Sequence, residues 1–105
     1  MISWEDFESV ELRIGTIIEV NEFPEARRPA YKLKVDFGPE VGIRKSSAQI
    51  TDLYDPETLL GKQVLAVTNF QPKQIGKFMS ECLVTGIKND EGAITLVSTD
   101  HKVSN

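Results

Sequence analysis

The first third of the chain contains an unusually long stretch in which apolar and polar residues alternate. A period of two is the signature of a β-strand, and the usual strand length is about 5–6 residues. Gly15 lies inside the stretch, at a position where a bend or bulge costs little. We therefore expect residues 10–22 to form a long, bent strand that serves two sides of a small barrel. Its apolar face is expected to hold Val10, Leu12, Ile14, Thr16, Ile18 and Val20.

The rest of the sequence predicts short strands around one short helix. The helix is marked by Asp55 as its N-cap, Pro56 in its first turn and Gly61 just beyond its end. A capping-box pattern predicts one helical turn near the N-terminus, at residues 3–7. Further strands are expected at residues 30–37, 41–49, 63–70, 79–88 and 94–97.

Three strands, a helix and two or three more strands are the order of elements in an OB-fold, an all-β, five-stranded Greek-key barrel. An SH3-like barrel and a split sandwich remain alternatives on pattern alone. The length of 105 residues fits a single domain spanning residues 1–105.

Charge and cysteine content indicate the setting in which the chain works. The formal net charge is −4, but residues 27–45 hold six basic side chains against two acidic ones. Such a basic segment can steer an anionic partner, although a merely solvated strand face would look the same. No apolar run reaches the length of a membrane span, and the acidic N-terminal residues lack a signal-peptide pattern. With a single cysteine, these features favour a cytoplasmic location.

The residues that usually carry catalysis are scarce. Cys82 and His101 are the only cysteine and histidine, too few for a Cys/His zinc site. We interpret Cys82 as a buried small apolar residue and His101 as a solvated residue of the tail. The chain has neither a GxGxxG motif nor a P-loop. We therefore expect a protein that binds rather than catalyses, with no metal and no cofactor.

Residues suited to binding RNA cluster on the expected second and third strands. In an OB-fold these strands carry the usual ligand face. Lysine and arginine can contact phosphates, while serine and glutamine supply neutral hydrogen bonds. The candidates are Lys32, Lys34, Arg44, Lys45, Ser46, Ser47 and Gln49.

The segment of residues 69–80 joins the expected fourth and fifth strands, another region that OB-folds use for ligands. It mixes lysines, amides and aromatic rings, a combination suited to backbone charge and base stacking. We expect Lys73, Gln74 and Lys77 to be exposed and most of its large apolar side chains to fill the core. Those apolar residues are Phe70, Ile75, Phe78 and Met79.

Four segments of the sequence together resemble one known family. They are residues 10–15 (VELRIG), 29–33 (PAYKL), 46–50 (SSAQI) and 69–83, which begins with Asn-Phe and ends with MSECL. The similarity is to the tRNA-binding-domain family, and in particular to its CsaA branch. It implies an OB-fold, a homodimer, and sequence-tolerant binding of tRNA by shape and phosphate backbone. By motif match it also implies binding roles for Arg44, Ser46, Ser47, Gln49, Asn69, Lys73 and Ser80.

The CsaA branch adds an alternative function, that of a chaperone or protein-export factor for unfolded or pre-export polypeptides. Two departures from the wider family bear on this choice. Gln71 stands where relatives commonly have a proline, and Cys82-Leu83 stands where the synthetase-appended branch tends to have Gly-Met. The second departure favours the CsaA branch over tRNA delivery to a synthetase. A peptide groove would use Asn69, Phe70, Gln71, Gln74, Ile75 and Phe78.

A homodimer would double the RNA-binding surface of so small a module. We expect a two-fold interface built from exposed apolar residues, since a symmetric contact needs one self-complementary patch. The candidates are Trp4, Phe7, Phe23 and the apolar part of the last strands, unless these side chains pack into their own barrel.

Overall fold

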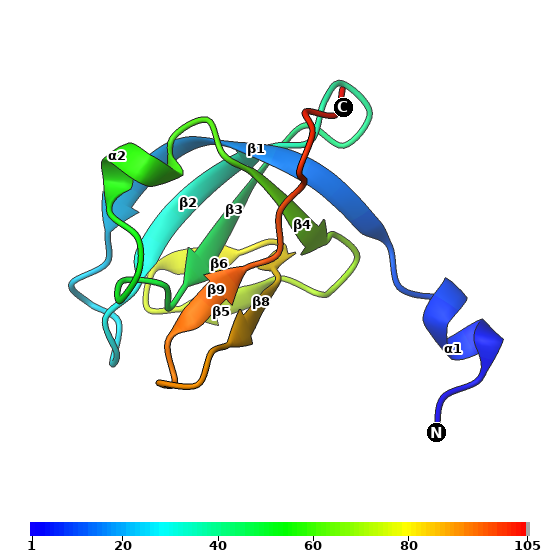
Figure 1. The fold of residues 1–105 in the computed structure, drawn as a ribbon, viewed down its shortest axis with the longest axis horizontal. Helices are drawn as coiled ribbons and strands as arrows, with labels where there is room; N and C mark the ends of the chain where they lie inside the picture. Colours follow the sequence, from blue (N-terminus) through cyan, green and yellow to red (C-terminus); the bar gives the residue numbers. More distant parts are fainter. Residues whose placement is uncertain (105) are drawn as a thin grey trace.

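The chain folds into a nearly closed, five-stranded antiparallel barrel of the OB type, seen in a computed structural model that describes residues 1–104. Its sheet has the strand order β3-β2-β1-β4-β7 (Figure 1). The strands are β1 (Leu12–Glu22), β2 (Tyr31–Asp36), β3 (Ile43–Ala48), β4 (Gln63–Val67) and β7 (Leu83–Val84). The all-β class and the barrel expected from the sequence are therefore confirmed.

Two short hairpins and two short helices complete the fold. The hairpins pair β5 (Lys73–Ile75) with β6 (Phe78–Ser80), and β8 (Gly86–Lys88) with β9 (Ile94–Leu96). The predicted strand at residues 79–88 is wrong as a single element, because the structure divides it among β6, β7 and β8. Breaks in the strand let the segment pair in turn with β5, β4 and β9. Strand β5 was not predicted.

Both helices lie where their capping residues predicted them. Helix α1 (Trp4–Glu8) begins at Ser3, whose hydroxyl accepts from the Asp6 N–H while the Asp6 carboxylate accepts from the Ser3 N–H. Helix α2 (Pro56–Leu59) begins at Asp55, whose carboxylate accepts from the Thr58 N–H. That bond lowers the pKa of Asp55. Helix α1 projects away from the barrel (Figure 1) and has no buried residue.

The long first strand forms as predicted, but its apolar face differs from the expectation. A bulge between Ile17 and Glu19 interrupts the alternation. N-terminal to the bulge, Gly15 and Ile17 face the core, while Leu12 is exposed; Ile18, within the bulge, is also exposed. Beyond the bulge, Val20 packs against the core as predicted. The expected six-residue face is therefore wrong, because one extra residue reverses the facing of the strand's first half.

The core lies inside the barrel and is built mainly from the inward residues of β1, β2 and β4. Its fully buried members include Ile17, Leu33, Val35, Leu59 and Val64. The buried Leu59 belongs to α2, so the short helix covers one end of the barrel. Among the described residues, no helix is long and apolar enough to cross a membrane.

Candidate nucleic-acid interface

Strand register brings three lysines together on the outer face of β2 and β3. Leu33 and Val35 are buried, so the alternating residues Lys32 and Lys34 point outward. Lys34 lies opposite Lys45 of β3, and Lys32 lies opposite Ser47. On the other side of β2, the same two lysines lie opposite Glu19 and Asn21 of β1. We call these six residues the basic sheet face; they are Glu19, Asn21, Lys32, Lys34, Lys45 and Ser47.

Aromatic rings support two of these lysines. The Lys32 ammonium lies 5.3 Å from the centroid of the Phe23 ring, and the Lys45 ammonium lies 5.4 Å from that of Phe78. The two rings contact each other edge to face, with centroids 5.3 Å apart. Contacts between a cation and a ring are worth about 0.5–1 kcal/mol at exposed sites, enough to restrict where the ammonium groups point. These contacts favour positions of the Lys32 and Lys45 ammonium groups over the two rings.

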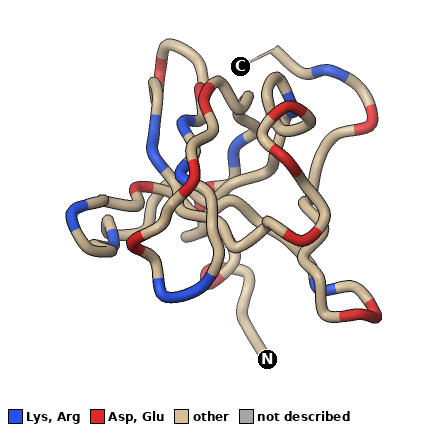
Figure 2. The backbone as a smooth tube through the Cα atoms, turned by 90° about the vertical axis from the view of Figure 1, so that its left-hand side faces the viewer, with Lys and Arg blue, Asp and Glu red and all other residues tan. Residues whose placement is uncertain are grey.

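A cavity of about 190 Å³ opens in this face. Its lining consists of Glu19, Asn21, Lys32, Leu33, Lys34, Lys45 and Phe78. The face is not uniformly basic, because Glu19 forms an ion pair with Lys34 at 3.7 Å. Figure 2 shows the same feature across the molecule, with Lys and Arg interleaved with Asp and Glu along neighbouring segments.

The predicted RNA-binding residues within residues 44–49 do not all lie on the same face of β3. Lys45 and Ser47 belong to the outer face, and Gln49 is exposed just beyond the strand. Ser46 points inward and is only 1% exposed. Arg44 lies on the same side of the strand as Ser46 and donates to the Thr68 carbonyl at 3.3 Å. Arg44 and Ser46 therefore lie apart from the basic sheet face, although the sequence grouped them with it.

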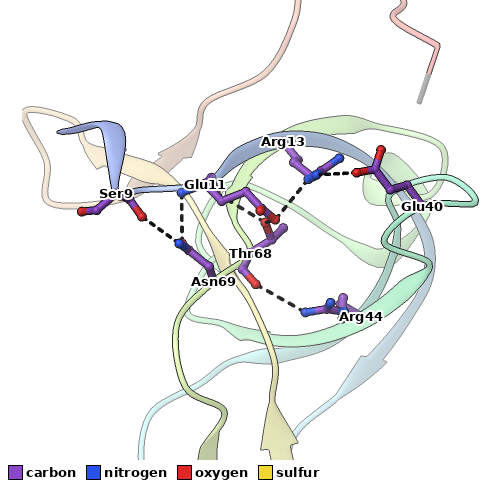
Figure 3. Close-up of polar contacts among 7 residues, drawn as sticks. All are labelled: Ser9, Glu11, Arg13, Glu40, Arg44, Thr68 and Asn69. Atoms are coloured by element: carbon purple, nitrogen blue, oxygen red, sulfur yellow. Dashed lines mark hydrogen bonds and ion pairs between the residues drawn. The ribbon is translucent and has the colours of Figure 1, made fainter. Parts of the chain in front are cut away.

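Arg44 belongs instead to a polar network at one end of the barrel (Figure 3). The Thr68 hydroxyl donates to the Glu11 carboxylate, which also accepts from Arg13 at 3.1 Å. The Arg13 guanidinium reaches Glu40 as well, at 3.2 Å. The bond from Thr68, and then the bond from Arg13, lower the pKa of Glu11. The network ties the start of β1 to the end of β4 and to the β2–β3 loop.

Two further predicted residues have their polar groups engaged within the chain. Asn69 accepts from the Glu11 N–H at 3.0 Å and donates to the Ser9 carbonyl at 2.7 Å, so it anchors the segment between α1 and β1 (Figure 3). The Ser80 hydroxyl accepts from the Ser47 N–H at 3.2 Å. Next to it, the Glu81 N–H donates to the Lys45 carbonyl, and the Glu81 carboxylate accepts from the Lys45 N–H. These bonds close the barrel between β3 and the segment that follows β6.

The β5–β6 hairpin and the residues before it are more exposed than predicted. None of Phe70, Ile75, Phe78 and Met79 is buried, so the expectation that most of them fill the core is wrong. The hairpin lies beside β3, where the Ser80 hydroxyl accepts from the Ser47 N–H, and Phe70, just before the hairpin, is 58% exposed. Lys73 and Gln74 are exposed on β5, as predicted, and Lys77 is exposed in the hairpin turn.

A second cavity, of about 270 Å³, lies beside Phe70. Phe70, Gln71, Lys73, Ser80, Cys82 and Leu83 line it. Phe70 and Gln71 of the predicted peptide groove thus share a cavity. Ile75 and Phe78 do not line it, and Phe78 instead lines the cavity of the basic sheet face. The other three predicted groove residues, Asn69, Gln74 and Ile75, line neither of these two cavities.

Neither Cys82 nor His101 lies in surroundings that would activate it for catalysis. Cys82 is buried, and its burial raises the pKa of the thiol to about 11. His101 is exposed in the C-terminal tail. No group of three or more His, Cys, Asp or Glu residues in the described part of the chain is placed to hold a metal ion.

Comparison with known families gives a match to the model described as "Putative tRNA binding domain", over residues 12–105. The chain belongs to the tRNA-binding-domain family. Curated family relatives include the methionine–tRNA ligases of Thermococcus kodakarensis, 36% identical over 102 residues, and of Methanocaldococcus jannaschii, 31% identical over 96 residues. These alignments cover 97% and 91% of this chain but only 13% and 14% of the ligases. The chain thus spans about one seventh of the length of these relatives.

Solved structures of the family give a more complete match. The chaperone CsaA of Bacillus anthracis is 47% identical with a TM-score of 0.93, covering 100% of this chain and 94% of that one. The CsaA chaperone of Picrophilus torridus is 46% identical, also with a TM-score of 0.93, and the coverage is 98% and 94%. The resemblance to the CsaA branch of the tRNA-binding-domain family is therefore confirmed.

Sequence reasoning missed three residues that shape this surface of the tRNA-binding domain. Glu19 and Asn21 are not basic, so a pattern of basic side chains does not reveal them. Phe23 was assigned to a dimer interface, but it is 4% exposed and packs against Phe78. The alternation of residues 19–22 after the bulge is the sequence signal that could have placed Glu19 and Asn21 on the outer face.

Proposed function

We propose that this chain is a non-catalytic, homodimeric tRNA-binding protein that contacts folded RNA by shape and phosphate backbone. The observation that carries the proposal is the basic sheet face, where Lys32, Lys34 and Lys45 lie on two adjacent strands of an OB barrel. Membership of the tRNA-binding-domain family supports tRNA as the ligand. Residues 1–105 are proposed to act as one domain. A cytoplasmic setting suits the protein, because its single cysteine is a free, buried thiol.

The proposed RNA-binding residues differ in how the structure supports them. Lys32, Lys34, Lys45 and Ser47 form the outer face, and Gln49, Lys73 and Gln74 are exposed around it. Arg44, Ser46, Asn69 and Ser80 are proposed to act by supporting the barrel, because each engages main-chain groups of the chain itself.

A salt titration of tRNA binding tests this proposal. Each phosphate contact that is removed should reduce the slope of log affinity against log salt by about 0.7–0.9. We expect Lys32→Ala and Lys45→Ala each to weaken tRNA binding and to reduce the slope by about 0.7–0.9, the value for one phosphate contact. Lys88→Ala is the matched control, since Lys88 is an exposed lysine of β8 outside the basic sheet face. Equal effects of all three variants would refute the assignment of the site.

A second candidate function, binding of unfolded or pre-export polypeptides, is supported by the cavity beside Phe70. Peptide grooves need an apolar floor with polar groups at the rim, and Phe70 is exposed there beside Gln71 and Lys73. The two similar CsaA proteins are described as chaperones. Phe70→Ser should weaken the binding of an unstructured peptide while leaving tRNA affinity unchanged. Loss of tRNA binding in Phe70→Ser, with peptide binding intact, would contradict this candidate.

The homodimer is supported by apolar side chains left outside the barrel. Trp4 and Phe7 of α1 are 81% and 50% exposed, on a helix that projects from the barrel (Figure 1). Leu12 and Leu83 are also exposed, and the β4 residue Val67 pairs with both. A second copy would cover this surface through a symmetric contact. Phe23 is no longer part of the proposed interface, because it is buried in its own chain.

A further inference from the structure

The cavity of the basic sheet face contains groups that phosphate binding alone does not require. A surface that only contacts phosphates needs cations, yet this cavity includes the Glu19 carboxylate, the Asn21 amide and the Phe78 ring. We propose that this cavity binds one unpaired nucleotide of the RNA and prefers a base that carries an exocyclic amino group. The proposal rests on the RNA-binding function proposed above and names the part of the RNA that this site recognises.

The small size of the cavity limits it to a small occupant such as a single base. Its volume of about 190 Å³ lies below the range of about 300–1,000 Å³ typical of sites for drug-sized ligands. Bases in an RNA helix cannot enter such a cavity, because they are stacked and paired. Unpaired bases in loops and at chain ends can be splayed out and inserted. The cavity therefore selects single-stranded or loop nucleotides from a folded RNA.

Phe78 provides a surface for stacking. Its ring is half-buried, contacts the Phe23 ring at an interplanar angle of 61°, and has the Lys45 ammonium 5.4 Å from its centroid. An incoming nucleotide brings both a flat base and a phosphate. Lys45 can move from the ring to the phosphate, and the base then takes its place against the ring. Lys32, held above Phe23, is placed for the phosphate on the other side of the nucleotide.

Glu19 and Asn21 give the site its chemical preference. The Glu19 Oε2 atom accepts from the Asn21 amide at 3.0 Å and pairs with Lys34 at 3.7 Å. Both contacts use Oε2, and no side chain or N–H among residues 1–104 donates to Oε1. A carboxylate repels phosphate but accepts a hydrogen bond from the amino group of cytosine or adenine. Uracil has no such group, so the site should discriminate against it.

Short single-stranded RNAs test the inference directly. The probes are a uridine heptamer and two heptamers in which the central uridine is replaced by adenosine or cytidine. We expect the wild-type protein to bind the substituted heptamers about five-fold more tightly, the lower end of the discrimination that base-edge hydrogen bonds provide. Glu19→Ala should abolish this preference without weakening the binding of the uridine heptamer, because it removes an acceptor and a negative charge together. Glu25→Ala, which removes an equal charge from an exposed loop residue, should keep the preference.

Stacking on Phe78 is tested with a second variant. Phe78→Leu should weaken the binding of all three heptamers by about ten-fold, within the range measured for base–aromatic stacking. It should leave an RNA duplex of similar length unaffected, which also shows that the variant is folded. A heptamer with 2-aminopurine at its centre should change fluorescence on binding the wild type but not Phe78→Leu.

The outcomes separate this inference from the proposed function. If tRNA and duplex RNA bind with the expected salt dependence but the heptamers show no base preference, the nucleotide site is refuted and the RNA-binding function stands. The nucleotide site is refuted equally if Glu25→Ala abolishes the preference as fully as Glu19→Ala. If no RNA binds at low salt, the proposed function itself fails.

Discussion

Gly15 shows how a single residue can be fixed by space rather than by backbone conformation. A Cβ atom at this position would overlap Val35 Cγ1 and lie 2.7 Å from Phe37 Cε1. Gly15→Ala should therefore reduce the free energy of unfolding by about 1–3 kcal/mol, the usual cost of overpacking a core. Urea denaturation measures this loss. In a double-mutant cycle with Val35→Ala, the combined loss should be smaller than the sum of the single losses. Strict additivity would contradict the close contact.

Cys82 provides a test of burial that depends on pH. Burial raises the pKa of its thiol from 9.0 to about 11 in the folded protein. Ionisation of the thiol in the unfolded state therefore begins at a lower pH than in the folded state. The contribution of Cys82 to stability should be complete below pH 9 and should fall as the pH rises through 11, by about 2–3 kcal/mol at most.

Two measurements check this prediction for Cys82. The difference in unfolding free energy between wild type and Cys82→Ala should shrink between pH 8 and pH 10.5. Taking this difference isolates the thiol from the lysines and tyrosines that titrate in the same pH range. At pH 8, the folded protein should react with a thiol reagent roughly 100-fold more slowly than the unfolded chain. Equal reaction rates would show that the thiol is accessible.

At the scale of elements, the sequence predicts features that depend on neighbouring residues but not the register between distant strands. Asp55, Pro56 and Ser3 mark helix starts through bonds within a few residues, so both helices were predicted. The bulge at Ile17/Glu19 depends on how β1 pairs with β2 and β4, and no local pattern encodes it. The candidate site follows the same rule. Alternation along single strands places Lys32, Lys34 and Lys45 outward and Arg44 on the opposite side. The hydrogen bond from Arg44 to Thr68, which engages its guanidinium, depends instead on a contact 24 residues away in the chain.

Closure of the barrel gives a prediction at the same scale. Glu81 exchanges two hydrogen bonds with Lys45, one through its main-chain N–H at 2.7 Å and one through its carboxylate at 2.9 Å. Glu81→Ala leaves the Lys45 N–H without its acceptor and should cost about 1–3 kcal/mol of stability. Glu81→Gln keeps an acceptor oxygen and should cost less. Urea denaturation compares the two, and hydrogen exchange at the Lys45 amide should accelerate only in Glu81→Ala. Equal losses would mean that the side-chain bond does not support the closure.

For the whole molecule, the arrangement of apolar surface predicts assembly. A helix of five residues is too short to be stable alone, and α1 has no buried residue to hold it against its own barrel. Burying a large apolar side chain is worth about 1.5–3 kcal/mol, so covering Trp4, Phe7, Leu12 and Leu83 in two copies would stabilise both α1 and the pair. Sedimentation at micromolar concentration should therefore give a mass twice that of the 11.7 kDa chain.

Variants locate the contact between the two copies. Trp4→Ser or Phe7→Ser should shift the equilibrium toward the monomer, by roughly ten-fold or more in the dissociation constant. Leu53→Ser removes an apolar side chain as exposed as Phe7 from the loop before α2 and should leave the dimer intact, because α2 lies across the barrel from α1 (Figure 1). Fluorescence of Trp4, the only tryptophan, should shift to shorter wavelength as the protein concentration rises. Because two basic sheet faces in one dimer can engage one RNA, monomeric variants should also bind tRNA more weakly with no change in their lysines. A wild-type protein that stays monomeric at all concentrations would refute this assembly.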